Sequence, residues 1–384
     1  MIPYGRQDIT DDDILAVERV LRSEFLTQGP VVPEFERAVA SSCGAAYAVA
    51  TNSATSALHI ACMALGLGPG DRLWTSPITF VASANCGLYC GAQVDFVDID
   101  PQTYNMSVEQ LAARLESAEK SGTLPKVVIP VHMCGQPCDM KAIHALGQRY
   151  GFRIIEDASH AIGASYGGET VGSCRYSDIT VFSFHPVKII TTGEGGVAIT
   201  NDEKLAADMA LLRSHGITRD SALMTHASEG PWYYQQIALG YNYRMTDIQA
   251  ALGLSQMSRH TAYVARREAL AQQYDVRLAQ LPVHLPKRAE NRRSAWHLYV
   301  IRVVASKRLA VLNAMRSVGI SVNVHYTPVH LQPYYRQYGF APGQFPSAEA
   351  HGAEAITLPL YPGLSAIDVD AVVEALADAV KTLL

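Results

Sequence analysis

Short apolar runs alternate with longer stretches compatible with helices between residues 47 and 200. Helix-like segments, such as 54–65 and 107–117, separate the earlier runs. This alternation is typical of a mainly parallel sheet covered by helices. A glycine-rich loop without a helix separates the last two runs, so the final strand is a candidate for antiparallel pairing. The predicted strands are 47–50, 72–75, 93–97, 127–130, 153–156, 179–183 and 197–200.

The chain of 384 residues is too long for one small domain. Thr246-Asp247-Ile248-Gln249 fits a capping box and opens a helical stretch to about residue 281. We expect a large α/β domain with the N-terminal segment over residues 1–250, and a small C-terminal domain over 251–384 entered through this long helix.

Further elements are predicted at both ends of the chain. A helix starts near Thr10, with Ile14, Val17 and Leu21 on one face. The stretch 326–346, rich in proline and tyrosine, is expected to be an ordered loop. In the small domain we predict strands at 297–303 and 321–325, and helices near 307–318 and from about 366.

Composition excludes several classes of protein. The net charge is −5 and no run of Lys or Arg stands out, which argues against a nucleic-acid or anionic-membrane partner. No apolar run reaches the roughly eighteen residues of a membrane span, and the charged segment 4–8 does not fit a signal peptide. Seven cysteines suit a reducing cytoplasm, and we interpret the C-x3-C pairs 86/90 and 134/138 as buried thiols, not a metal site.

Four polar segments follow predicted strands directly: 52–53, 77–80, 157–160 and 183–188. Ligands of open α/β sheets bind beyond the carboxyl ends of the strands, so these segments are expected to form one site. Lys188 stands out, because an amine that adds to a carbonyl must be unprotonated part of the time, and burial lowers its pKa. A lysine taken by itself is more often exposed to solvent. The other polar segments at the strand ends favour a functional role for Lys188 instead.

Three of these segments suit a cofactor, and each has an alternative. Asp157 could pair with a protonated ring nitrogen, cap a helix or bind a metal. The helix start at 51–57 could bind a phosphate or be a plain Ser/Thr-capped helix. Phe80 could stack on an aromatic ring or belong to the core. The glycines at 66, 68 and 70 follow a helix, so they indicate a turn and not a dinucleotide fingerprint.

Five motifs in a fixed order resemble those of the DegT/DnrJ/EryC1/StrS family of nucleotide-sugar aminotransferases, and the resemblance covers nearly the whole chain. It implies an α/β protein of the pyridoxal phosphate (PLP)-dependent transferase fold type I, similar to aspartate aminotransferase. That fold has a mainly parallel seven-stranded sheet and a smaller C-terminal α/β domain. The motifs are Asn52-Ser53-Ala54-Thr55-Ser56-Ala57-Leu58, Glu156-Asp157-Ala158-Ser159-His160, Ser183-Phe184-His185, Lys188 with 191–196, and Gly240-Tyr241-Asn242-Tyr243-Arg244-Met245.

The resemblance implies a role for each cofactor residue. Lys188 would carry PLP as a Schiff base and move protons, and Asp157 would pair with the pyridine nitrogen. Lysine at this position excludes the dehydrating branch of the family, which has histidine there. Phe80 would stack on the ring, and His160, where many relatives have glutamine, would lie beside it. The phosphate would be held by Ala54, Thr55 and Ser183, joined by Asn242 from the second subunit of a homodimer with shared active sites.

Within the family, the segments 2–7, 23–30 and 324–330 are most similar to the transaminases of pseudaminic acid biosynthesis. The implied reaction moves the amino group of L-glutamate to C4 of a UDP-4-keto-6-deoxy-N-acetylhexosamine, giving UDP-4-amino-4,6-dideoxy-N-acetyl-β-L-altrosamine. Alternatives are another UDP- or dTDP-4-keto sugar, a sugar dehydratase of the same fold, a non-catalytic sensor and a nicotinamide dehydrogenase. The substrate residues would be Tyr4, Glu24, Phe25, Leu26, Thr27, Ser53, Asn323, Val324, His325 and Tyr326.

Overall fold

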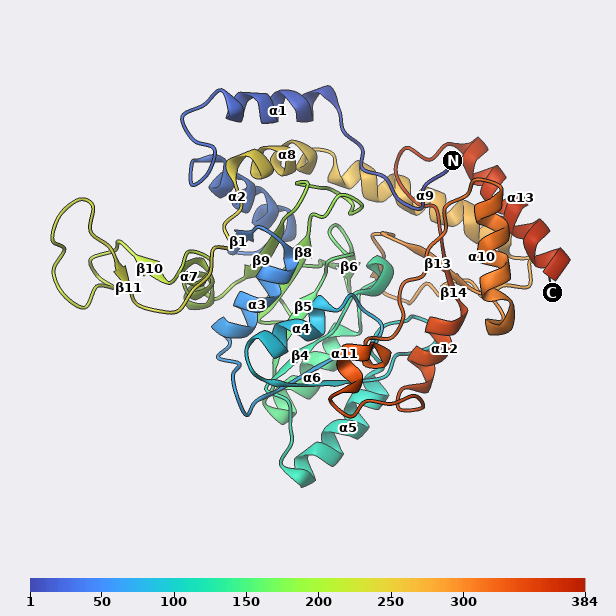
Figure 1. Cartoon of the computed structure of the whole chain (residues 1–384), viewed down its shortest axis with the longest axis horizontal. Coiled ribbons are helices and arrows are strands. Elements are labelled where there is room, and N and C mark those ends of the chain that lie inside the picture. The colour runs from blue at the N-terminus through green and yellow to red at the C-terminus, as the bar shows by residue number, and fades with distance from the viewer. Residues whose placement is uncertain (384) are drawn as a thin grey trace.

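The computed structural model describes residues 1–383 and has a seven-stranded sheet at its centre, in the order β1-β9-β8-β5-β4-β2-β3 (Figure 1). Every pair is parallel except those of β9, which runs antiparallel to both β1 and β8. The prediction of a mainly parallel sheet with an antiparallel final strand is therefore confirmed. The strands are β1 (Tyr47–Thr51), β2 (Arg72–Thr75), β3 (Gln93–Phe96), β4 (Val127–Ile129), β5 (Arg153–Asp157), β8 (Ile179–Ser183) and β9 (Gly196–Thr200).

Helices cover both faces of this sheet, because alternate strand residues are apolar on both sides. Ile155 and Val181 pack against α3 (Ala54–Ala64), α4 (Ala82–Tyr89) and α7 (Glu203–Leu212) on one face. Ile154 and Phe182 point to the other face, which is covered by α2 (Val31–Cys43), α5 (Val108–Ser121) and α6 (Met140–Tyr150). Ser53, Ser107, Asp139 and Asp202 cap the starts of α3, α5, α6 and α7.

The predicted capping box at Thr246 is present and starts α8 (Asp247–Met257). The single long helix predicted from there is wrong, because the chain breaks at Ser258-Arg259 and resumes as α9 (His260–Leu278). Arg259 is the N-cap residue of α9, and its guanidinium binds the buried carboxylate of Asp13. This contact ties the break to the N-terminal helix, a tertiary interaction that no local pattern signals.

The C-terminal part has its own core, in which α10 (Arg308–Ser317) and α13 (Ala366–Leu383) pack on the antiparallel pair β13 (Tyr299–Arg302) and β14 (Ala355–Leu358). The strand predicted at 321–325 does not form. Only Asn323 pairs with Thr357, and the Asn323 side chain then accepts a hydrogen bond from the Val324 amide, which turns the chain away. The segment 326–346 contains η3 (Val329–Leu331) and α11 (Pro333–Arg336), and α12 (Pro346–Glu354) follows.

The N-terminal segment connects the two parts of the chain. Ile2 forms a bridge with Ile320, and α1 (Asp11–Leu21) packs over α8 (Figure 1). Thr10 and Asp13 form a capping box at the start of α1, while Ile14 and Leu21 are exposed. The boundary at residue 250 stays a prediction.

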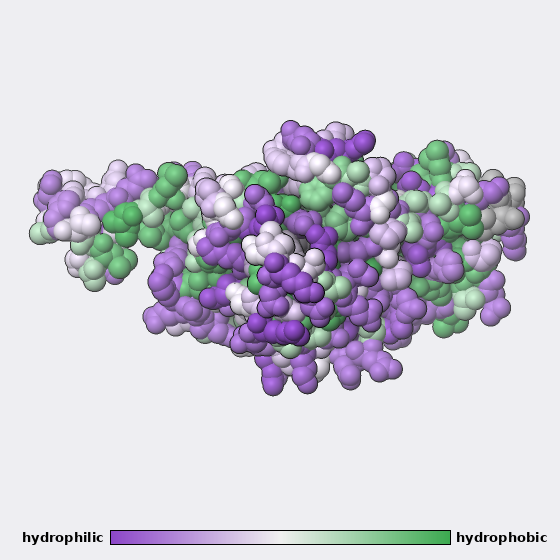
Figure 2. Space-filling view, turned by 90° about the horizontal axis from the view of Figure 1, so that it is seen from below, coloured by the Kyte–Doolittle hydropathy of each residue, from purple (hydrophilic) through white to green (hydrophobic). Residues whose placement is uncertain are grey.

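Short elements complete the fold. A long loop carrying the pair β10 (Ile217–Thr218) and β11 (Gln235–Gln236) projects from the body as an arm, which Figures 1 and 2 both show. No helix among residues 1–383 is long and apolar enough to cross a membrane. The remaining elements are β6 (Ser165–Tyr166), β7 (Glu169–Thr170), β12 (Arg292–Arg293), η1 (Met133–Gly135) and η2 (Ala305–Lys307).

Candidate active site

A cavity of about 880 Å³ opens at the carboxyl ends of β1, β5 and β8. The predicted convergence of the strand-end segments is therefore observed, and residues of the N-terminal segment and of the C-terminal part close the cavity. Eleven of the predicted site residues line it: Tyr4, Ser53, Ala54, Thr55, Phe80, Asp157, His160, Ser183, Lys188, His325 and Tyr326.

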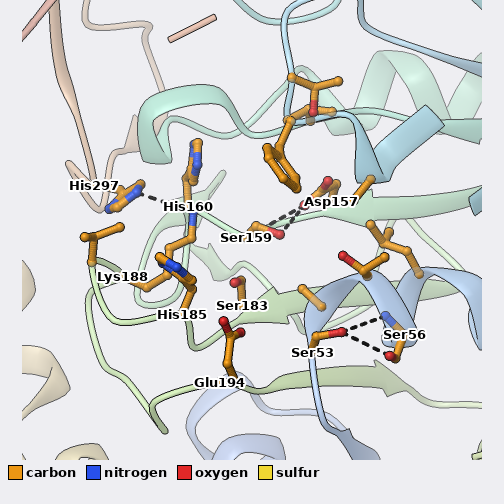
Figure 3. Close-up of a pocket in the computed structure, with 18 of the residues that line it drawn as sticks. Ser53, Ser56, Asp157, Ser159, His160, Ser183, His185, Lys188, Glu194 and His297 are labelled. Carbon is orange, nitrogen blue, oxygen red and sulfur yellow. Dashed lines mark hydrogen bonds between the residues drawn. The ribbon is translucent and has the colours of Figure 1, made fainter. Parts of the chain in front are cut away.

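Lys188 lies in the loop between β8 and β9, and its amine faces the cavity (Figure 3). Burial lowers its pKa from 10.5 to about 8, although the negative charge of Asp157 acts in the opposite direction. Its Nζ lies 3.5 Å from Nε2 of His297. Close to neutral pH the amine is therefore part of the time unprotonated and able to react with a carbonyl.

Asp157, the last residue of β5, has both carboxylate oxygens fixed by hydroxyl groups. Oδ2 accepts a hydrogen bond of 2.6 Å from Ser83, and Oδ1 accepts one of 2.6 Å from the Ser159 hydroxyl. No arginine or lysine forms a salt bridge with this carboxylate among residues 1–383. The buried negative charge therefore remains available to a cationic ligand group, such as a protonated ring nitrogen.

The start of α3 suits an anion. Ser53 accepts a hydrogen bond from the Ser56 amide, while the first amides of a helix have no acceptor inside the helix. Gly196 of β9 lies directly against this turn, so that a β-carbon there would come within 2.4 Å of the Ala54 nitrogen. The absence of a side chain at Gly196 lets the start of α3 pack directly against β9, where Ala54, Thr55 and Ser183 line the cavity.

Aromatic and imidazole rings form the remaining walls. The Phe80 ring is 60% exposed at the cavity wall, which is unusual for a phenylalanine and rules out the core alternative. His160 packs against His297 in a tilted arrangement with ring centroids 4.4 Å apart, and its Nε2 lies 3.4 Å from the Tyr326 hydroxyl. Burial and the nearby charge of Lys188 lower the pKa of His160 well below its usual value, so the ring is neutral.

Seven predicted residues do not line the cavity: Glu24, Phe25, Leu26, Thr27, Asn242, Asn323 and Val324. The turn 24–27 and Asn242 are exposed, and the turn is anchored where Leu26 accepts a hydrogen bond from the Asp247 amide. Their roles stay predictions.

Twelve other lining residues had no predicted role, although six of them lie inside the sequence motifs: Asn52, Ser56, Leu58, Ser159, His185 and Glu194. His297 had no local signal, because it precedes a strand of the C-terminal part. The twelve are Asn52, Ser56, Leu58, Thr79, Ala82, Val131, Ser159, His185, Val187, Glu194, Gln249 and His297.

Together, the sheet, the buried amine, the isolated carboxylate and the anion-binding turn define an enzyme of the PLP-dependent aminotransferase class. The model of the DegT/DnrJ/EryC1/StrS aminotransferase family matches residues 7–377, and the chain belongs to this family. It is a sugar aminotransferase of this family, with pyridoxal phosphate as its cofactor.

Individual relatives agree with this assignment. The spore coat polysaccharide biosynthesis protein SpsC of Bacillus subtilis is 41% identical over 387 residues, covering 99% of this chain and 97% of SpsC. The putative sugar aminotransferase Spr1654 of Streptococcus pneumoniae, solved in its PMP form, superposes with a TM-score of 0.91 at 31% identity over the full length of both chains. Helicobacter pylori PseC, an aminotransferase of pseudaminic acid biosynthesis, superposes with a TM-score of 0.91 at 30% identity, covering 99% of each chain.

The cavity has a feature to match each part of this cofactor. The turn cleared by Gly196 suits the phosphate, Asp157 suits the ring nitrogen, and the exposed Phe80 ring offers a face for stacking. The low pKa of Lys188 suits the aldehyde. The residues present therefore fit PLP.

Proposed function

We propose that this protein transfers the amino group of L-glutamate to C4 of a UDP-4-keto-6-deoxy-N-acetylhexosamine, using Lys188 as the cofactor-binding lysine. The observation that carries the proposal is the position of Lys188 and Asp157 in one cavity, at the ends of the adjacent parallel strands β8 and β5. The similarity to PseC supports the pseudaminic acid precursor, and the similarity to SpsC supports a polysaccharide precursor more generally.

Bound PLP supplies an electron sink for the pair released when a Cα–H bond breaks, and it carries the amino group between the two substrates. The neutral amine of Lys188 would take the proton from Cα of glutamate and deliver it to the cofactor carbon that bears the amino group. In the second half of the reaction it would move a proton in the opposite direction, from that carbon to C4 of the sugar. The carboxylate of Asp157 stabilises positive charge on the ring nitrogen, which strengthens the sink. The amides of Ala54 and Thr55, with the hydroxyl of Ser183, hold the phosphate.

The test is incubation of the protein with glutamate and a panel of UDP- and dTDP-4-keto sugars, followed by NMR of the products. Lys188→Ala is expected to abolish turnover, whereas Lys204→Ala, at an exposed lysine paired with Asp208, is expected to leave it unchanged. Full activity of the Lys188 variant, or a deoxy sugar in place of an amino sugar, would refute the proposal. A different preferred keto sugar would refute the pseudaminic precursor alone.

We also propose that two chains form a homodimer with shared sites, in which Asn242 reaches the phosphate bound by the partner. Support comes from the arm, which exposes several apolar side chains around its strands (Figure 2): Leu223, Trp232, Tyr234, Ile237 and Leu239. Mixing two inactive variants, Lys188→Ala and Asn242→Ala, then creates one intact site in each mixed dimer. About a quarter of the native activity is expected to return on mixing, and no recovery would contradict shared sites.

The same proposal includes the substrate contacts and the compartment. Tyr4, Ser53, His325 and Tyr326 already line the cavity and are proposed to contact the sugar, while the turn 24–27 and residues 323–324 are proposed to approach it when it binds. The seven cysteines are free, which supports a reducing compartment such as the cytoplasm.

A further inference from the structure

His297 lies between α9 and β13, and its ring enters the cavity beside Lys188 (Figure 3). The ring is only 4% exposed, and Nε2 lies 3.5 Å from Nζ of Lys188. The other ring nitrogen, Nδ1, is buried and has no hydrogen-bond partner among the described residues. Leaving the buried Nδ1 atom without a hydrogen-bond partner is unfavourable. A functional role for Nε2, the nitrogen that faces Lys188, would explain why a histidine occupies this position.

The backbone at His297 is held in place by a buried guanidinium. Nη1 of Arg267 donates hydrogen bonds to the carbonyl oxygens of Trp296 and His297, at 3.2 Å each, and to that of Leu360 at 2.8 Å. Arg267 is 1% exposed and forms no salt bridge in the part of the chain that the structure describes. A buried cation bound to carbonyl groups alone is rare, and here it fixes the turn that aims the imidazole.

The protonation state of the ring follows from its surroundings. Burial, with the charges of Lys188 and Arg267, lowers the pKa of His297 well below its usual value, so the ring carries one proton. An ammonium group has donors only, so Nε2 must accept from Lys188 and the proton must reside on Nδ1. Because Nδ1 has no partner to exchange with, this tautomer is retained when Lys188 loses its proton.

We propose that His297 is a positioning residue for proton transfer by Lys188. Its Nε2 accepts a hydrogen bond from the free amine and thereby directs the nitrogen lone pair towards the cavity. In the transfer step the Cα–H bond of the substrate breaks, an N–H bond forms on Nζ, and the electron pair of the broken bond passes to the cofactor. This inference rests on the role proposed above for Lys188, and it assigns His297 no direct contact with the substrate.

Other titratable groups around Lys188 differ from His297 in geometry. His160 interacts with the Tyr326 hydroxyl, and His325 accepts or donates at Nδ1 to Thr357 at 2.7 Å. Only His297 has a side-chain hydrogen bond to Nζ among the described residues. The titratable groups that line the cavity around Lys188 are Asp157 at the end of β5, His160 after it, His185 and Glu194 in the loop of Lys188, His297 before β13, and His325 and Tyr326 in the C-terminal part.

The first experiment uses the protein without cofactor, so that it does not depend on turnover. Labelling of Lys188 by acetic anhydride is followed by peptide mass spectrometry over a pH series, in the native chain and in His297→Phe and His297→Gln. Loss of the acceptor in the Phe variant is expected to lower the Lys188 pKa by about one unit, because the hydrogen bond favours the ammonium form. The Gln variant, whose amide oxygen can accept, is expected to restore most of the shift.

The second experiment measures the glutamate half-reaction of the loaded protein. In His297→Phe the rate constant is expected to fall about tenfold with an unchanged KM, and in His297→Gln to recover in part. His144→Gln, a histidine on α6 outside the cavity, controls for the exchange of residue type. If the Phe variant does not fold, His297→Leu takes its place.

Two outcomes overturn the proposal: an unchanged Lys188 pKa in the Phe variant, or equal losses of rate in the Phe and Gln variants. A failure of the proposed function is recognised separately. If borohydride reduction of the native loaded protein does not fix the cofactor on Lys188, the lysine assignment is wrong, whereas the labelling result still reports the contact between the two side chains.

Discussion

Gly196→Ala is predicted to damage the site through the backbone alone. Gly196 starts β9 and pairs with Thr51 on one side and Ser183 on the other. A β-carbon there would lie 2.4 Å from the Ala54 nitrogen, 2.5 Å from its Cα and 2.6 Å from the Ser53 carbonyl carbon. All three are backbone atoms, so no side-chain rotation relieves the clash. Since ordinary contact begins at 3.4 Å, the start of α3 must move by about 1 Å.

The size of the effect follows from two opposing contributions. Overpacking of a close-packed region costs about 1–3 kcal/mol, and a clash between backbone atoms belongs near the upper end. Replacing glycine restricts the unfolded chain and returns about 0.4–1 kcal/mol. We therefore expect a net loss of about 2 kcal/mol in the free energy of unfolding. On the phosphate-binding role proposed for Ala54 and Thr55, the displaced amides would also lose a charge-assisted hydrogen bond, so cofactor binding is expected to weaken about tenfold or more.

Both quantities are measurable without the sugar substrate. Urea unfolding followed by circular dichroism gives the stability of the cofactor-free protein, and visible absorbance during PLP titration gives the affinity. The matched control is Gly68→Ala, where an added β-carbon meets no atom within 4 Å and φ is not positive. An unchanged urea midpoint together with an unchanged Kd in Gly196→Ala would refute the argument from the clash.

Two further predictions concern the charges of the cavity. Asp157→Asn removes the charge that opposes the low pKa of Lys188, so we expect a lower Lys188 pKa by acetic anhydride labelling and a roughly 10²-fold slower glutamate half-reaction. The control is Asp208→Asn, at a half-buried carboxylate that pairs with Lys204 outside the cavity. Lys188→Met is expected to stabilise the cofactor-free protein below pH 8 by up to about 3 kcal/mol, since the native lysine has its pKa lowered from 10.5 to about 8 on folding. Between pH 8 and 10.5 the unfolded native chain binds more protons than the folded native chain, so the free energy of unfolding of the native protein must rise with pH. The advantage of the Met variant, measured by urea titration, must therefore shrink over this range. A constant difference between the two proteins would contradict the lowered pKa.

The sequence predicts the sheet and half of the cavity for the same physical reason. Each of the seven strands predicted for the central sheet begins and ends within one residue of the observed strand, because a short buried strand between turns is a local signal. Lys188, Asp157 and Ser53 follow such strands, so the parallel arrangement brings them together without further information. What the sequence cannot supply is a contact between distant elements, such as the pairing of Arg259 with Asp13 that accompanies the helix break.

His297 illustrates this limit within the site itself. Its position depends on Arg267, thirty residues earlier on α9, and on Gly135, where a β-carbon would lie 3.1 Å from the His297 amide. Neither residue carries a motif. The strand predicted at 321–325 is also absent, because the side-chain oxygen of Asn323 accepts a hydrogen bond from the Val324 amide in place of a strand partner.

The electrostatics of the cavity connect these observations to the reaction. Burial lowers the pKa of His160, His297 and His325, the last to about 3, so all three rings around the lysine are neutral at physiological pH. The lysine is then the only group of this cluster whose protonation changes near pH 8. The neutral ring of His297 accepts a hydrogen bond from the amine without repelling it. An imidazolium beside Lys188 would lower the Lys188 pKa further and so weaken the amine as a base for the Cα proton. On the role proposed for Lys188, the burial of the three histidines therefore keeps the lysine as the group that gains and loses the proton near neutral pH.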